Sequence, residues 1–402
     1  MPDIVVIGAG IVGASCAYYA AREGLSVTVV DRGSVAAGTT GAGEGNVLVS
    51  DKEPGPELDL ALLSGRLWHR LAEESEESEE SGETKEGRRS EGHAGFGDFE
   101  YEPKGGLVVA EDDRVLRVLT ELAGRQESSG VETRPVAAGE LADYEPHLAP
   151  GFAGGVFYPQ DAQVQPMLAA ARLLRRWPRV TLRTGTEVTG LVVQRGRVTG
   201  VRTDAGDIPA GAVVNAGGTW GGEIAALAGV TLPILPRRGF ILVTEPLDPA
   251  YGGLVRHKVY TAAYVAGVAS EAAGLETSAV VEATRAGTVL IGASRERVGF
   301  DRTVSLPVLA RLARQAVALF PALAEVRAIR AYCGFRPYCP DHLPVIGADP
   351  RVPGLYHACG HEGAGIGLAP ATGLLISRLL TGATPELDLT PFRPDRFAEA
   401  AA

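Results

Sequence analysis

Cysteine is scarce in this chain, and the four cysteines present are not spaced to hold a metal. Cys16, Cys333, Cys339 and Cys359 form no C-x-x-C pair and match no zinc or iron–sulfur spacing. We therefore expect no metal site and no disulfide framework. The simplest interpretation is a reduced protein of the cytoplasm.

The chain also lacks an excess of positive charge and a long uninterrupted apolar run. Its 38 Lys and Arg against 49 Asp and Glu leave a net charge of -11, which argues against nucleic acid or an anionic membrane surface as a partner. The most apolar stretch, residues 4–31, contains glycines and the charged pair Arg22 and Glu23, and no basic leader precedes it. We expect neither a membrane span nor a signal peptide.

One segment has no apolar residue at all. Residues 73–92, "EESEESEESGETKEGRRSEG", hold nine Glu against three Lys or Arg. Such a composition cannot offset the entropy lost on ordering, so it predicts a mobile acidic insertion on the surface. An acidic tail that binds a partner is the alternative.

The start of the chain predicts a βαβ unit. Residues 4–8, "IVVIG", are typical of a strand buried on both faces, residues 13–24 of a helix, and residues 26–31 of a second buried strand. The motif G-x-G-x-x-G falls at the first strand-to-helix turn. This placement predicts a dinucleotide cradle at the N-terminus of the helix.

Each glycine of this motif has a physical task. Gly8 permits the tight turn, Gly10 lets a pyrophosphate approach the backbone, and Gly13 allows helix and strand to pack closely. Asp31 ends the second strand, where its carboxylate can accept hydrogen bonds from ribose hydroxyls. The motif leaves NAD and FAD equally open.

Two later segments extend this cradle. Residues 36–46, "AAGTTGAGEGN", offer backbone N–H groups and the hydroxyls of Thr39 and Thr40 to a diphosphate, although an ordinary flexible loop is the alternative. Residues 180–220 predict a series of strands and turns, and the last strand, "AVVNAGG", can rejoin the first sheet.

Taken in order, these motifs and two C-terminal ones identify a resemblance that covers nearly the whole chain. The carriers are the opening βαβ unit, "GTTGAGEGN", "VVNAGGTW" at 213–220, "GFRPYCPDHLPVIG" at 334–347 and "GHEGAGIGLAPATG" at 360–373. The chain resembles the FAD-dependent amine and D-amino-acid oxidoreductases, the group of glycine oxidase, sarcosine oxidase and D-amino-acid dehydrogenase. Within that group it looks most like the flavin subunits of opine oxidase and D-hydroxyproline dehydrogenase.

The resemblance implies an α/β fold with two domains. A doubly wound, Rossmann-like FAD-binding domain would comprise residues 1–95, 160–230 and 335–402. Residues 96–159 and 231–334 would form a substrate domain with a mainly antiparallel sheet, including strands near 105–112, 237–246 and 287–294. We expect the active site between the two domains.

The resemblance also implies which residues bind FAD. They come from the nucleotide cradle, the glycine-rich loop and the C-terminal motifs: Gly8, Gly10, Ile11, Val12, Gly13, Asp31, Arg32, Thr39, Thr40, Gly45, Asn46, Val188, Gly217, Trp220, Gly334, Gly360, His361, Gly363, Gly365 and Ile366. Sarcosine oxidases attach flavin through a cysteine at the position of Gly334, and Cys333 is one residue out of register. We therefore expect FAD to be bound without a covalent bond, and Cys333 and Cys339 to be small core residues.

The C-terminal motifs predict a second helix N-terminus near the cofactor. Residues 340–347 and 354–361 each contain a short apolar strand, and residues 362–382 predict a helix. Its partial positive charge would stabilise a reduced, anionic flavin. His361 can add a hydrogen-bond donor there, or it can serve only as a capping residue.

Arg336 is the candidate for binding the substrate. A guanidinium between the apolar and rigid residues of "GFRPY" is satisfied by a bidentate carboxylate, or by a structural salt bridge. In the resembling family an arginine five residues before the aspartate of this turn holds the substrate carboxylate. Tyr260 and Tyr264 are further candidates that can equally be core aromatics.

The implied reaction is hydride transfer from the carbon of a C–N bond to flavin N5, giving an imine from a D-amino acid, D-hydroxyproline or an opine-like imino acid. The sequence offers no dedicated base, so His361 or solvent would take the proton. We expect a dehydrogenase that passes electrons to a partner, such as a second flavin subunit and a small iron–sulfur protein. The alternatives are a self-sufficient oxidase of the glycine or sarcosine type that makes hydrogen peroxide, another flavin chemistry such as glycerol-3-phosphate oxidation, and a non-catalytic flavin-bound subunit.

Overall fold

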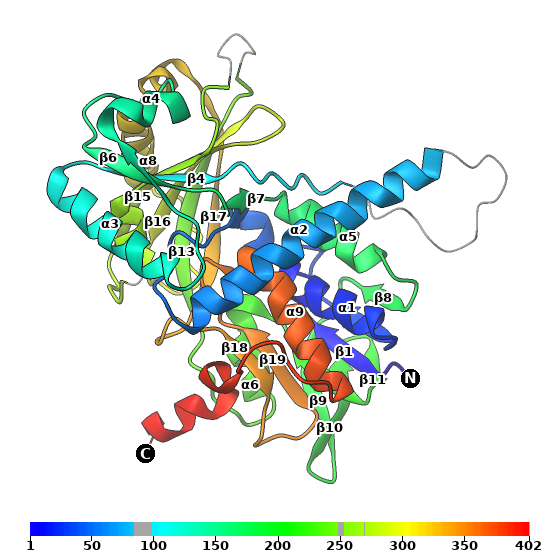
Figure 1. The fold of residues 1–402 in the computed structure, drawn as a ribbon. Helices are drawn as coiled ribbons and strands as arrows, with labels where there is room; N and C mark the ends of the chain where they lie inside the picture. The colour runs from blue at the N-terminus through cyan, green and yellow to red at the C-terminus, as the bar shows by residue number, and fades with distance from the viewer. Residues whose placement is uncertain (84–97, 248–252, 269, 402) are drawn as a thin grey trace.

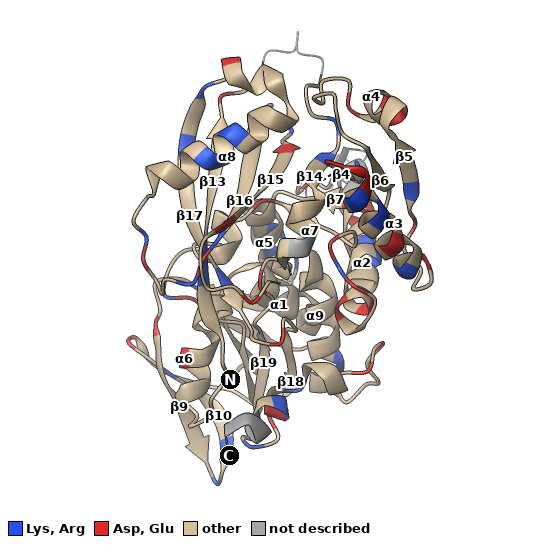
Figure 2. Ribbon diagram, turned by 90° about the vertical axis from the view of Figure 1, so that its left-hand side faces the viewer, with Lys and Arg blue, Asp and Glu red and all other residues tan. Residues whose placement is uncertain are grey.

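The computed structural model describes residues 1–83, 98–247, 253–268 and 270–401, which form two lobes, each built on its own sheet (Figure 1). Figure 2 shows the lobes end to end, with both chain termini at the end that holds β9, β10, β18 and β19.

The first lobe contains a six-stranded sheet in the order β18-β19-β12-β1-β2-β8. Its strands are β1 (Ile4–Ile7), β2 (Val27–Val30), β8 (Val180–Arg183), β12 (Ala212–Asn215), β18 (Val345–Ala348) and β19 (Leu355–Cys359). All neighbouring pairs are parallel except β18 with β19. As predicted, the strand that follows residue 211 rejoins the sheet directly beside β1.

Alternate side chains of β1 explain why this strand is apolar throughout. Ile4 and Val6 pack toward helices α1 and α9, whereas Val5 and Ile7 pack on the opposite face against a three-stranded sheet. The helices of this lobe are α1 (Ile11–Arg22), α2 (Pro56–Glu83), α5 (Pro166–Arg175), α6 (Gly221–Ala226) and α9 (Gly365–Thr381). The three-stranded sheet is an antiparallel meander of β9 (Val188–Gln194), β10 (Arg197–Thr203) and β11 (Gly206–Pro209).

The second lobe contains an eight-stranded sheet in the order β17-β13-β16-β15-β14-β4-β6-β5. Its strands are β4 (Gly106–Ala110), β5 (Arg134–Ala137), β6 (Gly154–Tyr158), β13 (Leu235–Thr244), β14 (Lys258–Thr261), β15 (Glu276–Ala283), β16 (Val289–Arg295) and β17 (Ala328–Tyr338). Within the described residues, β4 and β14 are the one parallel pair of this eight-stranded sheet. The expected mainly antiparallel second sheet is therefore confirmed.

Helices flank this second sheet. They are α3 (Asp113–Glu127), α4 (Leu141–Tyr144), α7 (Ala262–Val268) and α8 (Leu306–Leu319). Leu309, Leu312 and Leu319 of α8 pack with Val281 and Ile291 of the sheet. The side chain of Asp112 caps α3 by accepting from the backbone N–H groups of Arg114 and Val115.

One strand of the eight-stranded sheet crosses a predicted domain boundary. β17 belongs to the eight-stranded sheet over its full length, so it carries residues 328–338 past the expected boundary at 334/335. A short antiparallel pair, β3 (Asn46–Val47) with β7 (Ala162–Gln163), lies in the first lobe's segments.

The prediction of a mobile insertion at 73–92 is wrong for its first part. Helix α2 continues to Glu83, and the remainder from residue 84 lies outside the described residues. Glu74 accepts a hydrogen bond from the hydroxyl of Tyr18 at 2.8 Å and pairs with Arg22 at 2.9 Å, both on α1. Polar contacts of Glu74 with a neighbouring helix therefore support the start of this stretch.

Among the residues with a described placement, no helix has the length and apolar character needed to cross a membrane.

Candidate active site

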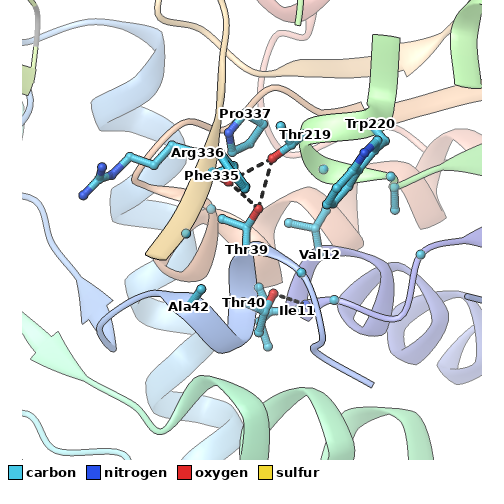
Figure 3. Close-up of a pocket in the computed structure, with 18 of the residues that line it drawn as sticks. Ile11, Val12, Thr39, Thr40, Ala42, Thr219, Trp220, Phe335, Arg336 and Pro337 are labelled. Carbon is cyan, nitrogen blue, oxygen red and sulfur yellow. Dashed lines mark hydrogen bonds between the residues drawn. The ribbon is translucent and has the colours of Figure 1, made fainter. Parts of the chain in front are cut away.

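A cavity of about 440 Å³ lies where the two lobes meet. Its lining combines the first strand-to-helix turn, the loop at 37–46, the segment at 216–220, and residues of β13, β17 and the start of α9. In Figure 3 the Arg336 side chain and the Trp220 ring lie on opposite sides of Thr39 and Phe335. The cavity therefore extends from the turn that is predicted to hold a nucleotide to the side chain of Arg336.

The glycines of the first turn have the geometry that the motif predicts. Gly8 has φ +112°, and a Cβ atom there would overlap the carbonyl oxygen of Ala216. A Cβ atom at Gly13 would overlap the carbonyl oxygen of Gly8, so this glycine allows helix α1 to approach β1. Gly8 and Gly10 line the cavity, whereas Gly13 lies behind it.

The end of the cavity near β2 is suited to an adenosine group. Asp31 lines it and holds the turn, because its carboxylate accepts the N–H groups of Ala9 at 2.8 Å and Gly33 at 2.7 Å. The guanidinium of Arg32 lies 4.5 Å from the centre of the Trp220 ring. Phe300, from the second lobe, stacks on the same ring at 5.2 Å.

The two threonines of the glycine-rich loop already have partners within the protein. The hydroxyl of Thr40 accepts the first free N–H of α1, that of Ile11, at 3.0 Å. The hydroxyl of Thr39 donates to the carbonyl of Phe335 at 2.7 Å, and Thr219 donates to the same oxygen at 2.9 Å (Figure 3). Both expected residues line the cavity, but their hydroxyls hold the loop in place.

Gly334 leaves no room for a side chain. A Cβ atom there would lie 2.7 Å from the carbonyl oxygen of Ala42, closer than real contacts allow. Cys333 precedes it on β17, where successive side chains point to opposite faces, and it packs with the core of the eight-stranded sheet. The four cysteines are all free.

A second helix N-terminus lies at the cavity, as the C-terminal motif predicts. Gly363, Gly365 and Ile366 at the start of α9 line it, together with His361. His361 is 3% exposed, and burial lowers its pKa to about 3, so the imidazole is neutral at physiological pH. Because Thr372 donates its hydroxyl hydrogen to Leu368, this hydroxyl accepts from His361 Nε2 at 3.0 Å.

This tautomer changes the expected role of His361. With the hydrogen on Nε2, the Nδ1 atom carries a lone pair and accepts rather than donates. A neutral ring with so low a pKa is also a poor base. The structure therefore does not support His361 as the extra donor or as the proton acceptor.

Arg336 extends along the cavity without a carboxylate partner among the described residues. Its Nη1 donates to the carbonyl of Ser294 at 2.8 Å, and no ion pair within 4.0 Å involves it in that part of the chain. A Cβ atom at Gly239 would overlap this guanidinium, so the glycine makes space for it. The alternative of a structural salt bridge thus finds no support.

The two candidate tyrosines are in different environments. Tyr264 lines the cavity, with the guanidinium of Arg295 5.3 Å from its ring centre. Tyr260 is fully buried outside the cavity, and its hydroxyl contacts Ser50 and Asp161. Tyr260 is thus a core aromatic, which was the alternative interpretation.

Some of the other residues expected to bind the cofactor line the cavity, and others lie outside it. Ile11, Val12, Asn46, Val188 and Gly217 line the cavity, whereas Gly45 and Gly360 do not. A Cβ atom at Gly45 would overlap the carbonyl oxygen of Val164, and Gly360 adopts φ +77° in the turn before α9. These two glycines shape the loops beside the cavity.

Glu44 and Arg302 are two of the lining residues that the sequence analysis did not predict. Glu44 lies inside the motif "GAGEGN", where a lone carboxylate among glycines is the available signal. Arg302 comes from the second lobe and lies 5.7 Å from the ring centre of Phe335. No local pattern distinguishes Arg302, because its place at the cavity depends on how the lobes pack.

Comparison with known proteins agrees with this geometry. The family model described as FAD dependent oxidoreductase (DAO) matches residues 3–379. The chain belongs to this family. It is 31% identical to the hydrogen cyanide synthase subunit HcnC of Pseudomonas aeruginosa, over 98% of this chain and 96% of that protein.

Solved structures give the same result. Glycine oxidase from Geobacillus kaustophilus superposes with a TM-score of 0.84 at 26% identity, covering 98% of both chains. L-proline dehydrogenase from P. horikoshii has a TM-score of 0.84 at 25% identity and covers 99% of this chain and 98% of that one.

The protein is therefore an FAD-dependent oxidoreductase, and the residues of the cavity fit this cofactor. The side-chain-free turn at Gly8 and Gly10 would hold the pyrophosphate at the N-terminus of α1. The N-terminus of α9 would face the flavin, where bound FAD supplies a two-electron acceptor.

Proposed function

We propose that this enzyme oxidises the C–N bond of a small amino or imino acid whose carboxylate binds Arg336. The single observation that carries the proposal is an arginine in the cofactor cavity with no carboxylate partner among the described residues. A guanidinium fork binds a carboxylate through two parallel hydrogen bonds. The names of the related proteins, glycine oxidase and L-proline dehydrogenase, support an amino acid as the substrate. D-amino acids, D-hydroxyproline and opine-like compounds belong to the same chemical class.

The electron acceptor that we propose is a partner protein rather than oxygen. In oxidases of the sarcosine type a lysine supplies the positive charge at which oxygen reacts with reduced flavin, and no lysine lines the cavity in the described part of the chain. Lys258 is held by Glu282 at 2.5 Å behind the cavity wall. HcnC is named a subunit, which supports an enzyme that works with partners. A second flavin subunit and a small iron–sulfur protein are the partners we propose.

Anaerobic bleaching of the purified flavoprotein, followed by turnover with a dye or oxygen, tests both the proposed substrate class and the proposed electron acceptor. We expect glycine, proline or a related D-amino acid to bleach the flavin absorbance, and an artificial dye to support faster turnover than oxygen. Hydrogen peroxide formed in stoichiometric amounts at the rate seen with the dye would instead establish a self-sufficient oxidase. Failure of every amino acid tested to bleach the flavin would reject the proposed substrate class.

We also propose that FAD is bound without a covalent bond, because Ala42 closes the space beside Gly334 and Cys333 faces away. Acid precipitation should release all yellow colour into the supernatant. Colour retained in the precipitated chain would contradict this.

A further inference from the structure

Glu44 is a buried carboxylate with one oxygen unused. The residue is 6% exposed and lines the cavity. Its Oε2 accepts a hydrogen bond from Asn46 Nδ2 at 2.9 Å, whereas its Oε1 is buried without a hydrogen-bond partner in the described structure. An unsatisfied buried carboxylate oxygen is costly, so its presence at a ligand cavity indicates a missing donor.

Glu44 shares its nearest cation with a second buried carboxylate. Lys258 lies 2.5 Å from Glu282 Oε2, contacts Asn46 Oδ1, and is farther from Glu44, at 3.9 Å. Glu282 also accepts the N–H of Gly45 at 3.2 Å. Two buried carboxylates therefore share one ammonium group, and the ammonium is committed to Glu282. Arg336, which has no carboxylate partner among the described residues, is the further cation that acts on Glu44, so a ligand between the two side chains would meet one charge of each sign.

Glu44 and Arg336 meet the same short stretch of β16. A Cβ atom at Gly292 would overlap Oε1 of Glu44, so the missing side chain makes room for this oxygen. Two residues later, the carbonyl of Ser294 accepts from Arg336. The cavity thus presents a carboxylate and a guanidinium from opposite lobes to one ligand. An amino acid carries the complementary pair of charges.

We propose that the carboxylate of Glu44 binds the amino group of the substrate and accepts its proton, while Arg336 holds the carboxylate of the substrate. This inference rests on the function proposed above. The N–H proton moves from the substrate ammonium to Glu44, leaving a neutral amine with a free electron pair. Bound FAD would supply the acceptor for the hydrogen and two electrons of the adjacent C–H bond, and the neutral amine would become an iminium ion. Glu44 is thereby the base that the sequence did not reveal.

The surroundings of Glu44 suit a proton acceptor. Burial raises its pKa above the usual range for glutamate, and the ammonium of Lys258 opposes this rise. The titratable and charged groups that face it from the packed elements are Lys258, Glu282, Tyr264, Tyr332 and Arg336. The ammonium group of the bound substrate would favour the ionised form of Glu44. The proton would therefore pass from the substrate to Glu44 only after the substrate has bound.

Two ligands that differ in one atom test the inference. Proline carries an amine, and tetrahydrofuran-2-carboxylate has oxygen in its place. Each is titrated anaerobically into the FAD-loaded enzyme, with the shift of the flavin spectrum as the binding signal. In Glu44→Gln we expect the Kd of proline to rise about tenfold or more, and the Kd of the ether to change less than about twofold.

The matched control is Glu362→Gln. This carboxylate also lines the cavity but already lies 3.4 Å from Arg237 and 3.0 Å from His342. We expect it to change the two Kd values by similar factors. Glu44→Asp keeps the charge and should retain part of the preference for the amine, and FAD content shows whether each variant folds.

The outcomes separate the two proposals. If the wild-type enzyme binds both ligands and Glu44→Gln weakens both equally, or neither, the role of Glu44 is overturned while the amino-acid function stands. If the wild-type enzyme binds neither ligand and no amino acid bleaches its flavin, both proposals fail together.

Discussion

Arg336 shows how one side chain can indicate a ligand by the partners it lacks. Its guanidinium uses one N–H for the carbonyl of Ser294 and leaves the others toward the cavity. We predict that Arg336→Lys raises KM for the best amino acid about 30-fold, corresponding to about 2 kcal/mol, because an ammonium cannot form two parallel hydrogen bonds. Steady-state kinetics with the dye measures this. An unchanged KM would assign Arg336 a structural role.

His361 is predicted to make stability depend on pH. Burial lowers its pKa to about 3, whereas the unfolded chain has the ordinary value of about 6.5. The unfolded state therefore binds a proton that the folded state does not, and stability falls as the pH falls from about 6.5 toward 3. We predict a weaker dependence on pH in His361→Asn over this range.

Chemical denaturation of both proteins at pH 7 and pH 5 measures this difference. Asp161, whose pKa burial raises to about 6, contributes with the opposite sign, but it is present in both proteins and cancels in the comparison. Equal losses of unfolding free energy in the two proteins would contradict a neutral, buried His361.

Helix α2 shows how an acidic segment can be held by polar contacts. Glu74 receives the Tyr18 hydroxyl and the Arg22 guanidinium across the helix interface, with side chains 26% exposed for Glu74 and 40% for Arg22. We predict that Glu74→Ala lowers the free energy of unfolding by about 1 kcal/mol and leaves FAD content unchanged.

The neighbouring Glu73 provides the control. Its side chain is 60% exposed and pairs with His69 at 3.4 Å within the same helix. Glu73→Ala should change stability by less than about 0.5 kcal/mol. Similar effects of the two substitutions in urea denaturation would show that the contact with α1 does not support α2.

One carbonyl group accepts two hydrogen bonds across the contact between the lobes. β17 is an edge strand of the eight-stranded sheet, and the Phe335 carbonyl accepts two hydroxyls from the first lobe, those of Thr39 and Thr219. The opposing N–H on β13, from Arg238, bonds to Glu296 instead. The threonines therefore satisfy an edge group that the sheet leaves open.

We predict that Thr39→Val and Thr219→Val each have a small effect alone, because the other hydroxyl still serves Phe335. The double variant leaves this carbonyl unsatisfied and should lose about 1–3 kcal/mol of stability, more than the sum of the single losses. Thermal unfolding of all four proteins forms the required cycle, and FAD titration of the apoproteins reports whether the cavity loosens. Strictly additive losses would argue against a shared acceptor.

Local patterns in the sequence determined the elements around the cofactor. The βαβ unit, the glycine turn, the return of the strand at 212–215 and the helix that begins near residue 365 are all present in the structure. Each depends on interactions between residues close in the chain: alternation of apolar side chains, glycine conformations and free helix termini. Interactions between neighbouring residues can therefore be predicted from the sequence before the fold is known.

Only the tertiary structure decided which charged side chains line the cavity or lie directly behind its wall. Glu44, Lys258 and Glu282 are far apart in the chain, and their unequal charges become visible only when three elements pack together. Tyr260 and Tyr264 are four residues apart, yet one lies in the core and the other at the cavity. Burial set the protonation of His361 in the same way. Desolvation and charge compensation depend on contacts distant in sequence, and these determined the chemistry of the site.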